Sequence, residues 1–196
     1  MNSGLDIISV LTAVVSAATA VIGMWLKIKY DEKKSKELNY DPRAHSNVVS
    51  ALNFIMQKTE ADRVYILEFH NGEHYFSGRS QQKLSCTYEV ISEGISSECQ
   101  NMQNIRVSNL HDLTKSIAEE KTFVCKDVAN YREDISFKSF LEKKGVKSLF
   151  SRPVKTLNGK ILGVICLEYV KEKREWGSDA EEFTEKQAIV ISGYLI

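Results

Sequence analysis

The residues best suited to bind a small molecule lie between positions 69 and 89, where the sequence reads FHNGEHYFSGRSQQKLSCTYE. Aromatic rings here can stack on a flat ligand, and two cations can form charge-assisted hydrogen bonds with an anionic one. We expect this segment to form one wall of a ligand site, the alternative being an exposed hairpin loop in which Gly72 and Gly78 serve turns. The candidate ligand-binding residues are His70, Asn71, Tyr75, Phe76, Arg79, Lys83, Tyr88 and Glu89.

Metal binding and catalysis have weaker support in the residue pattern. His70 and His74 are four positions apart, but this spacing defines a metal site only on a helix, and here it spans a strand end and a turn. We therefore expect no metal site. The sequence contains no phosphate-binding Gly loop, nucleophile elbow or zinc signature, which favours a protein that is not an enzyme. It identifies no cofactor.

The four cysteines are widely spaced and include no C-x-x-C pair, which favours reduced thiols in a cytosolic compartment. Thiol chemistry requires a lowered thiol pKa and a second thiol within reach. Cys86 and Cys166 fall in strand patterns, where we expect buried and inert thiols. Cys99 and Cys125 remain as the plausible partners, and their spacing matches no known thiol motif.

The composition limits the class of protein. The chain has 196 residues, enough for one domain and an appendage, with 26 basic and 26 acidic side chains. A nucleic-acid-binding protein should have a clear basic excess, so we expect no nucleic-acid partner.

The appendage is predicted to be a membrane anchor. Residues 7–26 carry no charge, and a helix of this length spans about 30 Å, the hydrocarbon thickness of a bilayer. Five lysines follow within residues 27–36, and no basic residue precedes the span, which places the N-terminus outside and the rest in the cytoplasm, at the cell (inner) membrane. The alternatives are a buried soluble helix and a signal peptide cleaved after Ala18-Thr19-Ala20, although the first six residues lack the usual basic charge.

Residues 1–26 are thus the expected anchor, 27–42 a charged juxtamembrane linker and 43–196 one mixed domain. Asp41-Pro42 is predicted to begin the first helix of this domain. The order of elements favours an α+β domain, with an antiparallel sheet that carries its first and last helices on one face. Expected helices cover residues 42–59, 112–120, 136–144 and 178 onward, and expected strands cover 63–70, 84–91, 122–128, 146–156 and 160–170.

Two local patterns define which side chains face inward. Alternation in the second strand places Leu84, Cys86, Tyr88 and Val90 on one face. A capping box at Ser178–Glu181 is predicted to open the last helix. The expected inner face of that helix comprises Phe183, Gln187, Val190, Ile191 and Tyr194.

The closing part of the sequence resembles a GAF domain. The matching features are Gly145-Val146, Pro153-Val154, a hairpin across Asn158-Gly159, and Gly163 in the strand that leads to Leu167-Glu168-Tyr169. Residues 43–70 resemble the opening helix and first strand of the family. The resemblance implies an antiparallel sheet flanked by helices, a ligand held between the sheet and the helices of the irregular middle, and a dimer surface on the first and last helices.

The resulting functional prediction is a single-pass, membrane-anchored GAF-like sensor or regulatory domain that binds a small ligand or a protein partner without catalysis. Small residues on one face of the span, such as Ala13 and Ala17, favour a homodimer or higher homo-oligomer. The resemblance includes no output module, so we expect output through a partner or a change in assembly. One alternative is a holin-like membrane-active protein of viral origin. Another is a thiol redox enzyme that resembles the GAF-type methionine sulfoxide reductase.

Overall fold

Six strands form one antiparallel sheet in the computed structural model, which describes residues 3–37, 42–75, 77 and 80–196. The strand order is β3-β2-β1-β6-β5-β4, so the first and sixth strands of the sequence pair at its centre. The strands are β1 (Arg63–His74), β2 (Ser80–Ile91), β3 (Ile105–Arg106), β4 (Phe123–Cys125), β5 (Ser148–Lys155) and β6 (Ile161–Tyr169). The helices are α1 (Ser3–Glu37), α2 (Pro42–Thr59), α3 (His111–Ala118), α4 (Ile135–Lys143) and α5 (Ser178–Tyr194), with short 3-10 helices η1 (Cys99–Met102) and η2 (Val107–Asn109).

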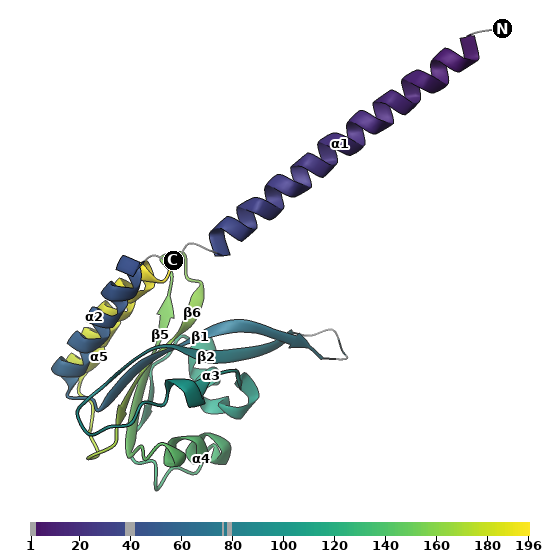
Figure 1. The fold of residues 1–196 in the computed structure, drawn as a ribbon. Helices are drawn as coiled ribbons and strands as arrows, with labels where there is room; N and C mark the ends of the chain where they lie inside the picture. The colour runs from purple at the N-terminus through teal and green to yellow at the C-terminus, as the bar shows by residue number, and fades with distance from the viewer. Residues whose placement is uncertain (1–2, 38–41, 76, 78–79) are drawn as a thin grey trace. The chain divides into compact units, whose positions relative to one another are not determined.

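Helices cover both faces of the sheet, as Figure 1 shows, with α2 and α5 on one face and α3 and α4 on the other. Both faces of β1 are therefore buried: Val64 and Ile66 pack toward α2 and α5, and Tyr65 and Leu67 pack on the opposite face. A strand buried on both faces is apolar throughout, which explains the continuous run in the sequence. The predicted α+β fold is confirmed.

A β-bulge in β2 changes the predicted facing of its side chains. Ile66 pairs with Tyr88 and Leu67 with Cys86, so Thr87 lies between two register positions without a partner on β1. An extra residue reverses the alternation from that point onward. Cys86 therefore faces α3 and α4, whereas Tyr88 packs on the α2 and α5 face. The prediction that they share a face was wrong.

Glycine is required at two predicted positions. A Cβ on Gly163 would lie 2.0 Å from the Leu67 carbonyl oxygen, because β6 passes close to β1 here. Gly159 adopts a φ of 82° in the turn between β5 and β6, as the Asn-Gly signal predicts.

The last helix differs from its prediction at its start and on its inner face. Gly177 precedes α5, and the Ser178 side chain does not cap it, so the predicted capping box is absent from this described segment. Val190 and Tyr194 are exposed rather than buried. The apolar residues of α5 fit more than one helix face, and the face that contains Ala188 and Ile191 packs on the sheet. The buried residues of α5 are Thr184, Ala188, Ile191 and Ser192.

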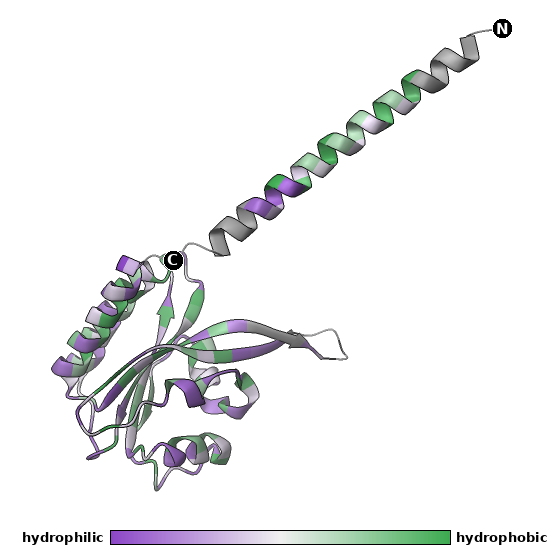
Figure 2. Ribbon diagram, in the orientation of Figure 1, coloured by the Kyte–Doolittle hydropathy of each residue, from purple (hydrophilic) through white to green (hydrophobic). Residues whose placement is uncertain are grey.

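The N-terminal helix and residues 43–196 are two separate compact units, and each is considered by itself. In α1 the helix continues through the charged residues 27–37. Residues Val10–Asp31 have a mean hydropathy of 1.7 and are long and apolar enough to cross a membrane. Figure 2 shows hydrophobic residues along the middle of α1. The predicted N-cap, Asp41, lies outside the described residues.

Candidate functional site

The segment predicted as a binding wall consists largely of strand. β1 continues to His74 and β2 begins at Ser80, so the loop expected between residues 70 and 84 is much shorter. The pairing of β1 with β2 continues past the predicted strand ends, to His74 and Ser80. Asn71, which was predicted to end the first strand, pairs with Gln82 within the ladder. Tyr75 is 43% exposed, and Phe76 and Arg79 lie outside the described residues.

The remaining candidate residues lie in different parts of the domain. His70 is exposed and its Nε2 lies 2.9 Å from the Ser85 hydroxyl, while Lys83 lies opposite it in the β1–β2 ladder. Tyr88 contacts the His45 ring on the α2 side, at 5.2 Å between centroids. His70, Tyr75, Lys83, Tyr88 and Glu89, which the structure describes with their side chains, therefore do not converge on one cavity, and of these five only Glu89 belongs to a buried polar cluster.

Glu168 is the centre of this cluster. Its carboxylate is fully buried and accepts hydrogen bonds from Arg63 and Lys144, and a third from the Tyr65 hydroxyl at 2.7 Å. Lys144 also donates to Tyr65 Oη at 3.1 Å and lies 3.5 Å from Met102 Sδ. Strands β1 and β6 are thereby joined to the C-terminal end of α4.

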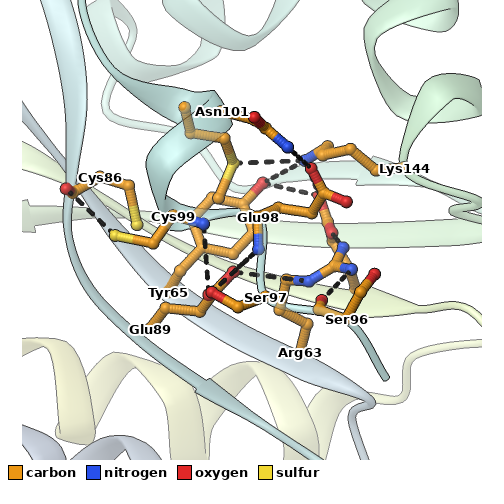
Figure 3. Close-up of polar contacts among 12 residues, drawn as sticks. Arg63, Tyr65, Cys86, Glu89, Ser96, Ser97, Glu98, Cys99, Asn101 and Lys144 are labelled. Atoms are coloured by element: carbon orange, nitrogen blue, oxygen red, sulfur yellow. Dashed lines mark hydrogen bonds and ion pairs between the residues drawn. The ribbon is translucent and has the colours of Figure 1, made fainter. Parts of the chain in front are cut away.

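Glu89 extends the cluster to the chain that follows β2. Its carboxylate lies 3.5 Å from Arg63 Nε and accepts backbone hydrogen bonds from Glu98 at 3.0 Å and Cys99 at 3.2 Å. Figure 3 shows Glu89 between the guanidinium of Arg63 and this backbone, with the Ser97 hydroxyl also directed at it. Two carboxylates and two cations compensate one another, and we call Arg63, Tyr65, Glu89, Lys144 and Glu168 the buried ion network.

The network keeps Glu168 ionised. Burial raises the pKa of this carboxyl, but the charges of Lys144 and Arg63, with hydrogen bonds from Lys144 and Tyr65, outweigh burial and leave the pKa below its ordinary value. Burial, together with the neighbouring Cys166 and Glu168, raises the pKa of Tyr65, so its hydroxyl stays protonated as a donor. Sequence reasoning missed these residues, although a charged Glu168 within the apolar run of β6 was a usable signal.

Two thiols lie beside the network. Cys99 Sγ is 3.5 Å from the Cys86 carbonyl oxygen, and Gln103 donates a hydrogen bond of 2.8 Å to that same oxygen. Cys99 is half-buried, whereas the other three cysteines are buried. Burial raises the pKa of Cys86 and Cys125, and raises the pKa of Cys166 to about 12. Cys125, one of the two plausible thiol partners in the sequence, is buried in the core under α3 and α4.

The sheet face beneath α3 and α4 is filled by the protein's own side chains. Tyr65, Met102, Leu110, Phe137 and Cys166 are at most 1% exposed there. These side chains take up part of the space that the GAF resemblance assigns to a ligand.

A cleft of about 700 Å³ opens beside this core, between residues 101–110 and α4. Its size suits a small organic molecule. Phe140 links the two features, since its ring lines the cleft and lies 4.2 Å from Lys144 Nζ. The cleft is lined by Asn101, Asn104, Ile105, Arg106, Asn109, Leu110, Ile135, Ser136, Ser139, Phe140 and Lys143.

Other ligand types find less support. Among the described residues, no group of three or more His, Cys, Asp or Glu side chains is placed to hold a metal ion. A smaller groove of about 360 Å³ includes Phe69 and Gln82 from the predicted wall, together with Ile117 and Ile161. The cleft beside α4 is the larger of the two and the richer in polar groups, so we take it as the candidate ligand site.

Comparison with known structures finds many sensory domains of the same fold. The blue-light-absorbing form of the PixJ GAF domain from Thermosynechococcus elongatus is 13% identical, with a TM-score of 0.64 over 78% of this chain and 84% of that one. A GAF domain from Synechocystis in its photoproduct state is 10% identical, with a TM-score of 0.60 over 76% of this chain and 90% of that one. A domain described as part of a two-component sensor histidine kinase of Sinorhizobium meliloti is 15% identical, with a TM-score of 0.54 over 74% and 86%.

Curated protein sequences gave no match to this chain. The sequence pattern of the GAF domain matches residues 49–194, from the middle of α2 to the end of α5. Because this match covers well over half of its length, the chain belongs to the GAF domain family.

Proposed function

We propose that this protein is a membrane-anchored, non-catalytic sensor or regulatory protein whose GAF domain binds a small ligand. The observation that carries this proposal is a GAF domain in the same chain as a helix with exposed apolar side chains. The large hydrophobic side chains between Val10 and Leu26 are 55–67% exposed. Within the described residues no protein surface covers them, and burial in a bilayer would remove this apolar area from water. The sensory descriptions of the structural neighbours support the same assignment.

The proposed topology has the N-terminus outside and residues 43–196 in the cytoplasm. The lysines at 27–36 carry this orientation through the positive-inside bias. The test is membrane fractionation of the full chain together with an enzymatic reporter fused after Ile196. The reporter should be active in the cytoplasm and the chain should require detergent for extraction.

Three results would count against the proposed topology and function. Reporter activity outside the cytoplasm would reverse the orientation, and a mature N-terminus at Val21 would indicate a cleaved signal sequence. Permeabilisation of a bacterial membrane upon expression would instead favour the holin-like alternative.

We further propose that two copies associate through α2 and α5. Phe54 on α2 is 42% exposed, and on α5 Ile189 is 54% and Val190 43% exposed. Two copies anchored in one membrane are confined near one another, which lowers the entropic cost of pairing these faces. Light scattering of the full chain in detergent should give a dimer, and Ile189→Lys should shift it toward the monomer. An unchanged mass in this variant, with the exposed Lys160→Gln as control, would refute the α5 interface.

A further inference from the structure

We propose that the cleft beside α4 binds a small organic anion, whose charged group is held by Arg106 and Lys143 and whose apolar part lies against Phe140 and Ile135. This inference rests on the proposed function, because it names the chemical class of the ligand. It concerns the open cleft between residues 101–110 and α4.

The charge of the cleft lining is one-sided. Among the described residues that line it there are two cations and no Asp or Glu, although acidic and basic residues are equal in number over the whole chain. Glu98, at its margin, already accepts a hydrogen bond of 2.8 Å from Asn101. The lining therefore offers an anion positive charge, against the negative charge that Glu98 contributes next to Asn101.

The two cations also have unused hydrogen-bonding capacity. Neither the Arg106 side chain nor the Lys143 side chain forms a hydrogen bond or an ion pair with another described residue. On the same helix, Lys138 lies 3.6 Å from Glu142, so Lys143 is left as the uncompensated charge of α4. Such groups can engage a ligand without first breaking a contact within the protein.

The remaining lining groups suit a ligand with a polar and an apolar part. The side chains of Asn104, Asn109, Ser136 and Ser139 make no hydrogen bond to another described residue and can donate or accept. Ile135 is 63% exposed, an unusual position for a large apolar residue unless something covers it. Phe140 offers a ring for stacking.

The probe for this proposal is phenyl phosphate, which combines an anionic group with a flat apolar ring, and its neutral counterpart is benzyl alcohol. Calorimetric titration of the full chain in detergent should detect binding of phenyl phosphate and weaker or no binding of benzyl alcohol. Arg106→Gln and Lys143→Gln should each weaken phenyl phosphate binding about five- to tenfold, which is less than a buried charge-assisted hydrogen bond would give, because the cleft is open to solvent. Thermal unfolding of both variants should match the wild type, because both residues are exposed.

The matched control removes two positive charges that lie outside the cleft. Lys126→Gln/Lys160→Gln changes two exposed lysines that do not line the cleft, and it should alter binding less than twofold. The proposal is overturned if this control weakens binding as much as Arg106→Gln/Lys143→Gln, if benzyl alcohol binds equally well, or if phenyl phosphate does not bind. None of these results affects the membrane and topology tests, so failure of the anion site and failure of the proposed function are separable.

Discussion

Replacement of Glu168 by Gln tests whether the buried ion network stabilises the fold. The carboxylate is fully buried and is shared by Arg63 and Lys144. Gln has nearly the same volume but no charge, so it leaves Lys144 in the core with the Tyr65 hydroxyl as its main remaining partner. Arg63 keeps Glu89 at 3.5 Å and the Ser96 carbonyl at 2.9 Å.

The expected loss in the free energy of unfolding is about 3–5 kcal/mol, as for other buried ion pairs from which one partner is removed. A domain of this size has a total stability of about 5–15 kcal/mol, so the loss should lower Tm by roughly 10 °C. The pH dependence should change as well. The folded-state pKa of Glu168 lies below its unfolded value, so its contribution is present above pH of about 4.3 and is lost as the pH falls through the folded pKa. The difference between the wild type and Glu168→Gln should therefore shrink in acid.

The assay is thermal and urea unfolding of the full chain in detergent, followed by near-UV circular dichroism. Glu182→Gln is the control, since Glu182 forms an exposed ion pair with Lys186 and should leave unfolding unchanged. Adding Lys144→Met to Glu168→Gln removes the orphaned cation and should restore part of the stability. A loss below about 1 kcal/mol for Glu168→Gln, or no recovery with Lys144→Met, would refute the reasoning.

Three further substitutions or reactions test other parts of the structure. Gly163→Ala should destabilise the domain by about 3 kcal/mol or more, because its Cβ would meet the Leu67 carbonyl at 2.0 Å, whereas Gly193→Ala in α5 has free space and should be neutral or stabilising in urea unfolding. Iodoacetamide should alkylate Cys99 well before the other thiols, and mass spectrometry should show this fast phase lost in Cys99→Ser. Asp134→Ala should cost about 1 kcal/mol in the same unfolding assay, because Asp134 caps α4 through the Phe137 amide at 3.0 Å, and Asp134→Asn should retain most of that stability.

Local patterns predicted the elements of this domain well. The 3.6-residue spacing of Val48, Leu52 and Ile55 identified α2 and its buried face. The Asn-Gly pair identified the β5–β6 turn, and Gly145 ends α4 with a φ of 71°, as expected for a residue after a helix. These features depend on neighbours in the sequence, and for that reason they could be read from it.

The candidate site could not be predicted in the same way, because it depends on register and on distant pairs. The bulge at Thr87 places Glu89 on the same face as Cys86, and strict alternation would have separated them. Arg63 and Glu168 are 105 positions apart and meet only because β1 pairs with β6. The cleft likewise combines residues 101–110 with α4, segments whose adjacency no local pattern reveals.

Both walls of the cleft are attached to the buried ion network, and this leads to a final prediction. In the α4 wall, Lys144 directly follows the cleft residue Lys143 and donates a hydrogen bond to Glu168. In the opposite wall, Glu89 accepts hydrogen bonds from the backbone of residues 98 and 99, which precede the cleft residue Asn101. Loss of the Glu168 charge should loosen the attachment of the α4 wall, because Lys144 loses its carboxylate partner. Glu168→Gln should therefore weaken phenyl phosphate binding severalfold, even at temperatures where the domain remains folded.

The control for this prediction must lose similar stability without touching the cleft. Leu52→Ala meets this condition, because Leu52 is fully buried on the α2 and α5 face, and such truncations cost about 2–5 kcal/mol. Calorimetric titration should give the wild-type affinity for Leu52→Ala and a reduced affinity for Glu168→Gln. Equal affinities in the two variants would show that the network stabilises the fold without positioning the cleft, since a general loss of stability acts on both variants alike.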